Sequence, residues 1–241
     1  MYSECNEGRH YAGLGFAIKK ALLESVIKFN PISERISTIR LKGRIKNISV
    51  VTFYAPTEEK EDDIKDTFYS QLEDTLNNIP RYDMKIILGD ANAKVGKESI
   101  WRSITGKESL HDVSNDNGIR LLSFANSHNL FVASTSFPRK DIHKQTWKSP
   151  DERTINQIDH VLIDSRHKSS IMDVKSLRGA ECGTDHFLVL AKIRQKLKIE
   201  KREKHNVDKI IHFEPENVER FKLELYNRFG PLELDDTKMR K

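Results

Sequence analysis

The segment Met84–Asn92 constrains the fold more than any other stretch of the chain. It is an apolar run that leads into a glycine turn, which predicts a buried strand with polar side chains at its end. Two further strand-like segments, residues 157–163 and 184–190, also carry acidic and imidazole groups near an end. Strand ends that gather such groups suit the metal-assisted attack of water on a phosphodiester. The side chains presented in this way are Asp90, Asn92, Asp159, Asp185 and His186.

Each requirement of phosphodiester hydrolysis matches one of these residue types. Magnesium prefers oxygen ligands, so Asp90, Asp159 and Asp185 are the pool for a metal ion and for polarising water. A protonated His186 can stabilise phosphate charge if a carboxylate holds its ring, and Asp159 is the candidate. The side chains that can donate hydrogen bonds to phosphate oxygens are those of Asn92 and Tyr54.

The remaining pattern predicts two helices in a β-rich chain. One helix is expected after Thr57, which would cap an acidic first turn, because apolar residues recur every four positions from Ile64 to Leu76. A second is expected to begin at Asn117-Gly118. Two helices among about nine strands predict an α/β layered sandwich. Strands are expected at residues 13–18, 35–41, 47–55, 83–88, 130–133, 146–148, 158–163, 171–177 and 186–193.

Each motif taken alone is also compatible with an ordinary structural role. We expect His160 on the solvent face of its strand, and we expect Trp101 and Trp147 to pack rather than to bind bases. Gly89–Asn92 and Asp185-His186 can each form a simple turn, and Tyr54 can be an aromatic at the edge of the core. The joint occurrence of the motifs is what favours function over these structural roles.

Charge divides the chain into a nearly neutral body and a basic segment. Residues 192–210 hold 8 Lys or Arg against 3 Asp or Glu, which accounts for the whole net charge of +5. We therefore expect a folded domain over residues 1–194 and a basic linker over 195–212. Residues 213–241 are expected to form an amphipathic helix and tail, with the helix docking on this body or on a protein partner. The basic run is either a solvated linker or a nucleic-acid contact.

Composition also bears on the compartment. The polar N-terminal residues do not match a secretory signal or a transit segment, and no apolar run approaches the roughly 18 residues that span a bilayer. The sequence has 2 cysteines, too few for a disulfide framework. We expect a soluble intracellular protein, nuclear or cytoplasmic, that is neither secreted nor bound to a membrane.

Four motifs together resemble a known family. Their order and contexts are similar to those of the endonuclease/exonuclease/phosphatase superfamily, which includes the relatives of deoxyribonuclease I and the apurinic endonucleases. The resemblance covers about residues 13–194. The motifs are Thr52-Phe53-Tyr54-Ala55-Pro56, Gly89-Asp90-Ala91-Asn92, Ile158-Asp159-His160 and Thr184-Asp185-His186.

A narrower resemblance is to the endonuclease domain of non-LTR retrotransposon polyproteins, and to cellular proteins named craniofacial development protein 2-like. The tail, residues 221–229, is similar to the linker that leads in such polyproteins to a reverse transcriptase. The segments that carry this resemblance are residues 117–124, Thr146-Trp147 and residues 156–161.

This resemblance implies a two-sheet α/β sandwich of the deoxyribonuclease I-like fold and a Mg²⁺-dependent cleavage of DNA, with Mn²⁺ as an alternative ion. Asp90 would orient and deprotonate the attacking water, and would join Asp185 in supporting the metal directly or through water. Asp159 would orient His186 against the scissile group. By the same resemblance, Asn92 would hold the phosphate and Tyr54 would contact it.

One departure from the family is expected to weaken activity. The family begins with a strand that carries an Asn and a second strand that ends in the Glu serving as principal metal ligand, both before the segment matching residues 13–16. Neither is present here, and Glu4 and Glu7 lie too close to that segment to replace the Glu. We therefore expect a fold that lacks its first strands, with unpaired neighbouring backbone and weak or no nuclease activity.

Two other functions remain open. An inositol-phosphate phosphatase or sphingomyelinase would share the fold, but residues 156–160 lack the Trp-Cys-Asp-Arg run of inositol phosphatases. A catalytically inactive nucleic-acid-binding or interaction protein would instead use the basic run and the final helix. DNA binding that survives Asp185→Ala but needs residues 196–204 would favour this second alternative.

Overall fold

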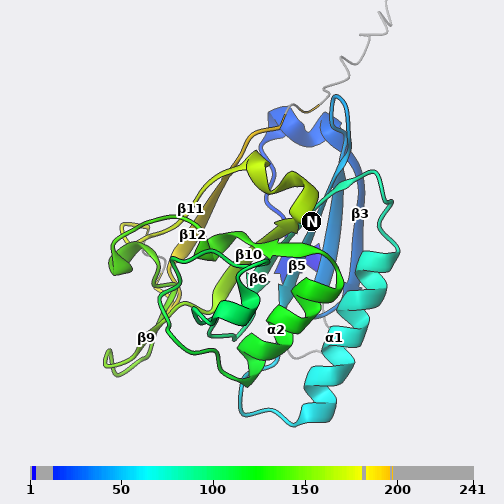
Figure 1. The fold of residues 1–241 in the computed structure, drawn as a ribbon. Helices are drawn as coiled ribbons and strands as arrows, with labels where there is room; N and C mark the ends of the chain where they lie inside the picture. Colours follow the sequence, from blue (N-terminus) through cyan, green and yellow to red (C-terminus); the bar gives the residue numbers. More distant parts are fainter. Residues whose placement is uncertain (1, 4–12, 181–182, 196, 198–241) are drawn as a thin grey trace, which may run out of the picture. The chain divides into compact units, whose positions relative to one another are not determined.

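The computed structural model describes residues 2–3, 13–180, 183–195 and 197. Its main element is a six-stranded sheet in the order β3-β4-β5-β6-β10-β7 (Figure 1). Neighbouring strands are antiparallel except β5 and β6, which are parallel and are connected through helix α1. The strands are β3 (Val26–Ser33), β4 (Ile36–Leu41), β5 (Ile48–Tyr54), β6 (Met84–Asp90), β7 (Leu130–Val132) and β10 (Asp159–Asp164).

Smaller elements complete the described part. The helices are α1 (Asp62–Asn77) and α2 (Asp116–Ser127), with five short 3₁₀ helices, η1 (Lys20–Ser25), η2 (Ser99–Trp101), η3 (Ala133–Thr135), η4 (Asp141–His143) and η5 (Ser165–Ser170). Three antiparallel strand pairs are β1 (Tyr2–Ser3) with β2 (Leu14–Gly15), β8 (Trp147–Lys148) with β9 (Ile155–Asn156), and β11 (Ile171–Leu177) with β12 (Leu188–Ile193).

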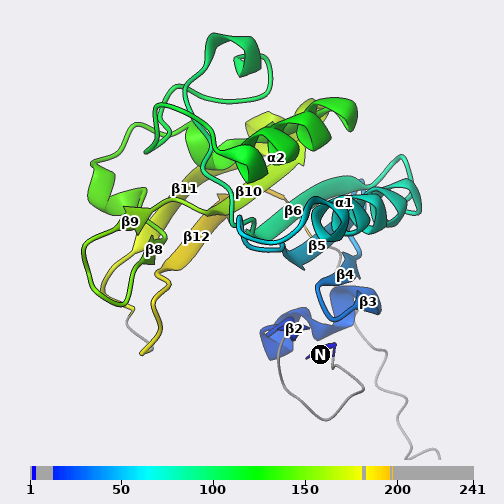
Figure 2. The same cartoon turned by 90° about the horizontal axis from the view of Figure 1, so that it is seen from below.

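The six-stranded sheet is covered on both faces, as the view in Figure 2 shows. On one face, Phe68 and Leu72 of α1 and Leu121 of α2 pack with Val51 and Ile87 of the sheet. Each such buried side chain contributes roughly 1.5–3 kcal/mol to stability. The opposite face forms a second core with β11 and β12, whose buried members are Ile48, Met84, Ile86, Ala133, Val161, Ile163, Ile171 and Val174. The predicted α/β layered sandwich is therefore confirmed.

The first predicted helix exists but begins later than expected. Thr57 does not cap it, because Thr57 belongs to a turn closed by a hydrogen bond from Lys60 N to its carbonyl, 3.1 Å long. The helix starts at Asp62, and Glu61 precedes it without a side-chain cap. Ile64, placed by periodicity on the buried face, is 44% exposed. The packed face therefore starts one turn further along, at Phe68.

Two predictions for the first strands are wrong. The strand expected over residues 13–18 is confined to Leu14–Gly15, and strand β3, which contains Pro31, was not among the expected strands. Proline lacks a backbone N–H and is tolerated where a strand borders the sheet, and β3 is an end strand in the sheet order. Strand β3 can therefore contain Pro31 and still pair with β4 along the edge that faces the rest of the sheet.

The predicted linker at 195–212 and helix and tail at 213–241 lie outside the described residues, apart from positions 195 and 197. The same holds for Glu4 and Glu7. Among the described residues, no helix combines the length and apolar character needed to cross a bilayer.

Candidate active site

Three of the predicted site residues lie side by side at one end of the six-stranded sheet. Tyr54 ends β5 and is paired in register with Asp90 at the end of β6. Asp159, which begins β10, is the antiparallel partner of the same Asp90. Because side chains two apart along a strand share a face, Asp90 and Asp159 face the same side as Ile86 and Val161, towards β11 and β12. The sheet thus delivers three polar side chains to the point where the two sheets meet.

The turn after β6 is shaped by a close backbone approach and a positive φ. A Cβ on Gly89 would lie 1.9 Å from the carbonyl oxygen of Phe53, so the pairing of β5 with β6 requires glycine there. Asn92 has a φ of 47°, a conformation that asparagine tolerates better than most residues. Its backbone N–H donates to Asp90 Oδ1 over 2.9 Å. This local bond fixes the carboxylate of Asp90 relative to the turn.

The side-chain amide of Asn92 connects two loops. Its Nδ2 donates to the carbonyl oxygen of Ala55 over 2.9 Å and lies 3.4 Å from Asp90 Oδ2. Asn92 therefore orients Asp90 from both its backbone and its side chain. The predicted contact of Asn92 with a phosphate remains a prediction.

His186 lies between the two carboxylates of the sheet. Its Nδ1 donates to Asp159 Oδ2 over 3.2 Å, and its Nε2 lies 3.9 Å from Asp90 Oδ2. The hydrogen bond to Asp159 raises the pKa of His186, and the negative charges of Asp159, Asp90 and Asp185 raise it further, against the opposing effect of burial. The geometry favours a charged imidazolium that has one N–H on Asp159 and the other towards Asp90.

Burial raises the pKa of Asp90 to about 6. The charge of Asp159 raises it next, and that of Asp185 contributes, while the N–H of Asn92 and the charge of His186 lower it. Ionised Asp90 therefore lies in a site with an excess of negative charge. Such a site is stabilised by a cation, and a carboxylate with a pKa near neutrality is suited to accept a proton from water.

The oxygen donors of the site are of the type that a hard divalent cation prefers. Magnesium usually keeps several waters and is bound through one or two carboxylates together with substrate phosphates. Asp90 and Asp185 provide two carboxylates that interact electrostatically. Within the part of the chain that the structure describes, no group of three His, Cys, Asp or Glu side chains is arranged to hold a metal ion.

Asp185 and His186 are positioned by an antiparallel contact with β8. The backbone N–H of Lys148 donates to the carbonyl of Asp185 over 2.9 Å, and that of Phe187 donates to the carbonyl of Thr146 over 2.8 Å. Thr146 Oγ1 in turn accepts from the backbone N–H groups of Ile158 and Asp159, over 3.0 and 3.1 Å. Thr146 therefore joins the segments that carry Asp159 and His186.

His160 was expected on the solvent face, and this prediction is wrong. The residue is 1% exposed, its Nε2 donates to the carbonyl of Ala93 over 2.9 Å, and its Nδ1 is 2.8 Å from Ser134 Oγ. Because Nε2 carries the ring proton, Nδ1 of His160 accepts a hydrogen bond from the Ser134 hydroxyl. Strand β10 lies between β6 and β7, and its face opposite Asp159 is covered by protein. Burial lowers the pKa of His160, so it serves as a neutral link to the segment after Asn92.

Asn117 is a second residue whose role the sequence did not indicate. It is 2% exposed near the start of α2, and its Nδ2 donates to the carbonyls of Pro56 and Asn92, over 3.1 and 3.0 Å. One amide thus holds together the loops that follow Tyr54 and Asp90. In the sequence, Asn117 lies at the start of a predicted helix, where capping residues are expected. Nothing in the sequence therefore distinguished its role in joining the two loops from helix capping.

Arg35, at the start of the segment leading into β4, borders the site. Its guanidinium lies 5.0 Å from the centre of the Tyr54 ring, and its Nη1 donates to the Tyr54 carbonyl over 3.3 Å. The contact is of the cation–π type. Arg35 therefore places a positive charge next to the residue expected to contact phosphate.

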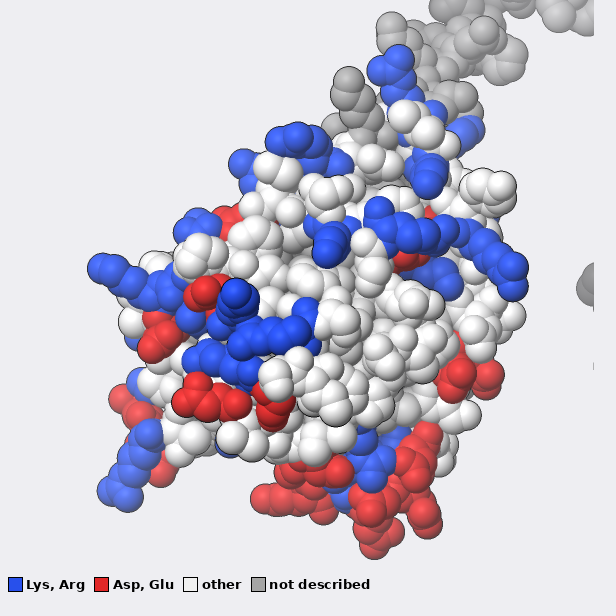
Figure 3. All heavy atoms as spheres, in the orientation of Figure 1, with Lys and Arg blue, Asp and Glu red and all other residues white. Residues whose placement is uncertain are grey.

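The surface around this end of the sheet carries both signs of charge. Figure 3 shows Asp and Glu side chains gathered around the N-terminal end of α1. Arg120 on α2 pairs with three acidic side chains, Asp62, Asp66 and Asp116. The acidic group is therefore partly neutralised within the protein.

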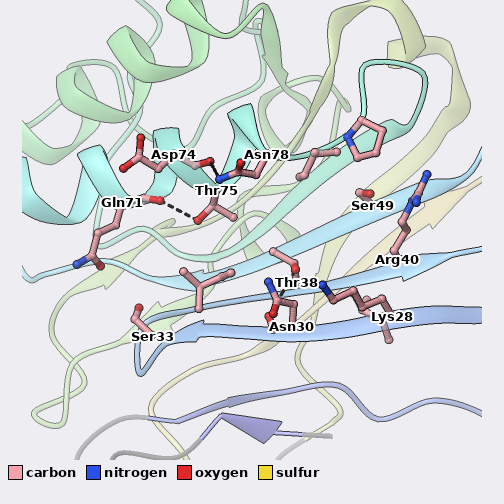
Figure 4. A pocket seen from close by; sticks show the side chains of 14 residues that line it. Lys28, Asn30, Ser33, Thr38, Arg40, Ser49, Gln71, Asp74, Thr75 and Asn78 are labelled. Atoms are coloured by element: carbon pink, nitrogen blue, oxygen red, sulfur yellow. Dashed lines mark hydrogen bonds between the residues drawn. The ribbon is translucent and has the colours of Figure 1, made fainter.

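A cavity of about 560 Å³ lies elsewhere, between α1 and strands β3 and β4 (Figure 4). Its walls include Lys28, Thr38 and Arg40 from the sheet, Gln71 from the helix and Asn78 directly after it. None of the predicted site residues lines it, and Arg40 is committed to Asp83 through a bond of 2.7 Å. The cavity is therefore separate from the candidate active site.

Comparison with known proteins matches residues 48–190 to the family described as endonuclease-reverse transcriptase. Craniofacial development protein 2 from Bos taurus is 36% identical over 187 residues, which are 78% of this chain and 31% of that protein. The chain thus spans about a third of the length of this relative. The corresponding protein of Tragulus javanicus is also 36% identical, over 78% of this chain and 32% of its own length.

Solved structures show weaker similarity. The endonuclease domain of TRAS1, a telomere-specific non-LTR retrotransposon, has 18% identity and a TM-score of 0.48, covering 68% of this chain and 63% of that domain. An AP endonuclease from Archaeoglobus fulgidus has 16% identity and a TM-score of 0.49, with 70% of each chain covered.

Proposed function

The chain belongs to the endonuclease-reverse transcriptase family, within the endonuclease/exonuclease/phosphatase superfamily, and we propose that it is a divalent-metal-dependent phosphodiesterase that cleaves DNA. The observation that carries this proposal is the convergence of His186 with two carboxylates. Its ring nitrogens lie 3.2 Å from Asp159 Oδ2 and 3.9 Å from Asp90 Oδ2. An acid, a base and an orienting group within one cluster of side chains are what hydrolysis by activated water requires.

The chain's own side chains take distinct roles in this proposal. Asp90 accepts the proton of the attacking water, for which a pKa of about 6 leaves it mostly ionised at neutral pH. His186 donates to a phosphoryl oxygen through Nε2, and Asp159 holds the ring by accepting from Nδ1. Tyr54 lies beside Asp90 in register and donates its hydroxyl to the phosphate.

Asp185 and Asp90 would hold a Mg²⁺ ion, or Mn²⁺ in its place. When bound, the cation neutralises the carboxylates and the charge that develops on the phosphate. Asn92 secures Asp90 through its N–H and borders the same site, where it is proposed to hold the phosphate.

DNA is the proposed substrate because the matching family is described as endonuclease-reverse transcriptase and because a cluster of Asp90, Asp159 and His186 suits attack of water on a phosphodiester. A DNA substrate would place the activity in the nucleus or the cytoplasm. Since the chain spans 31% of its bovine relative, whole-protein functions and a protein partner for residues 213–241 remain proposals.

Nicking of supercoiled plasmid tests the proposal. The full chain is incubated with Mg²⁺, with Mn²⁺ and with EDTA, beside Asp90→Asn and the exposed control Asp74→Asn. We expect slow, metal-dependent nicking by the wild type and the control, and a further loss of at least 100-fold in Asp90→Asn, since general-base catalysis contributes about 10²–10⁴-fold. Nicking that is independent of metal or of Asp90 would contradict the proposal. Salt-dependent DNA binding without nicking would instead support the inactive nucleic-acid-binding alternative.

A further inference from the structure

The indole of Trp147 is hydrogen-bonded to a predicted metal ligand. Its Nε1–H donates to Asp185 Oδ2 over 2.8 Å, a good length for a bond to a charged acceptor. Asp185 is otherwise exposed to solvent, so its carboxylate would be free to rotate without this bond. The indole therefore restricts the carboxylate to one orientation.

The backbone around this pair is fixed as well. Trp147 and His186 form an antiparallel bridge, which is flanked by the bonds from Lys148 to Asp185 and from Phe187 to Thr146. Donor and acceptor are thus held by the same short ladder. Only Oδ2 of Asp185 is used by the indole, which leaves Oδ1 for another partner.

Core packing does not account for Trp147. The two hydrophobic cores include Trp101 among the partly buried side chains packed against them, but Trp147 is not in either group. Strand β8 is two residues long, and its pairing with β9 uses backbone atoms that any residue provides. The specific contribution of a tryptophan at this position is its N–H.

We propose that Trp147 is a positioning residue that presents Asp185 to the divalent cation of the site. The inference rests on the proposed function, in which Asp185 is a metal ligand. A donor that orients a ligating carboxylate reduces the freedom lost on metal binding, and changes to such outer partners commonly cost 10–100-fold in metal affinity. Trp147 would act through Asp185 and would not touch the substrate.

Metal affinity in the absence of DNA is the test. The full chain is titrated with Mn²⁺ and the dissociation constant is measured by calorimetry for the wild type, Trp147→Phe and Trp101→Phe. Phenylalanine keeps an aromatic ring and removes the N–H, and Trp101→Phe is the matched control on the other tryptophan. We expect about tenfold weaker Mn²⁺ binding in Trp147→Phe and no change in Trp101→Phe. An unchanged constant in Trp147→Phe would overturn the inference.

A luminescence experiment keeps the inference testable if Trp147→Phe folds poorly. Terbium is a hard, oxygen-seeking cation whose emission is sensitised by a nearby indole. In a Trp101→Phe background Trp147 is the single tryptophan, because the chain has 2. We expect sensitised Tb³⁺ emission that Mg²⁺ competes away and that Asp185→Asn abolishes. Absence of sensitised emission, or its survival in Asp185→Asn, would refute the positioning role.

These readouts separate the two proposals. Loss of nicking in Asp90→Asn with an unchanged Mn²⁺ constant in Trp147→Phe would retain the phosphodiesterase and reject the role of Trp147. Metal binding that depends on Trp147, without nicking by the wild type, would retain the positioning role and reject the phosphodiesterase.

Discussion

His186 donates from Nδ1 to the carboxylate of Asp159 over 3.2 Å, although the two residues are 27 positions apart in the chain. The bond joins the six-stranded sheet to the segment that leads into β12, on the side where the second sheet packs. It orients the imidazole ring and raises the pKa of His186. The chemistry proposed for the site depends on this bond.

Asp159→Asn is expected to lower the pKa of His186. The substitution removes the largest factor that raises that pKa and leaves burial, which lowers it. Titration of the His186 ring by NMR measures the effect, with Asp74→Asn on the exposed face of α1 as control. A His186 pKa that is the same in Asp159→Asn and wild type would show that the bond does not form in solution.

Asp90→Asn is expected to increase stability while removing activity. The folded-state pKa of Asp90 is about 6 against an ordinary 3.8, so its favourable contribution is present at low pH and is lost as the pH rises through 6. At neutral pH, the ionised carboxylate costs about 3 kcal/mol, which Asn does not incur. The gain of Asp90→Asn over wild type in urea unfolding should grow by about 1–2 kcal/mol between pH 5 and 7.5. A constant or shrinking difference would contradict the shift.

Asn117→Ala is expected to destabilise the chain and to slow nicking. The change leaves the buried carbonyl of Pro56 and the partly buried carbonyl of Asn92 without this donor, at a cost of about 1–3 kcal/mol, and loosens the turn that carries Asp90. Asn126→Ala, at an exposed position of the same helix, is the control. Thermal unfolding and nicking at a temperature where both variants are folded measure the two effects. Equal behaviour of both variants would show that Asn117 does not support the site.

His160→Phe is expected to cost about 2–4 kcal/mol, because the hydroxyl of Ser134 and the carbonyl of Ala93 lose their shared partner inside the protein. The lowered pKa values of His160 and His111 also predict that the folded protein loses stability in acid. Burial lowers the pKa of His160, and it lowers that of His111 to about 4, so their contributions to stability decline as the pH falls below 6.5. Urea unfolding at pH 5 and 7.5 should show a smaller pH effect in His160→Phe. A larger effect would show that His160 is charged in the folded state.

Much of the sheet could be predicted because its signals are local. Strand β11 matches the predicted range 171–177, and β6 begins one residue after the predicted start, since turn residues bound each apolar run. Strand β3 could not be predicted, because the tolerance of Pro31 depends on its place at the border of the sheet. That place is a property of the sheet order, which no local pattern contains.

The residue types of the site could be predicted from the sequence, but the residues that position them could not. The strand ends indicated Asp90, Asp159 and His186, and the structure brings these three together. The solvent-facing assignment of His160 assumed one open face, whereas the fold covers both. The bond from Trp147 to Asp185 joins residues 38 positions apart through backbone pairing, so neither residue's neighbours in sequence indicate it. The loss of activity expected from the N-terminal departure stays a prediction.

Kinetic coupling between Asp159 and His186 tests the central claim most directly. Mg²⁺-dependent plasmid nicking rates are measured for Asp159→Asn, His186→Ala and the double variant beside the wild type. If the two residues act as one unit, each single change slows nicking strongly and the double variant is within about threefold of the slower single variant. Losses that multiply in the double variant, or single variants as active as wild type, would show that these groups do not work together on a phosphodiester.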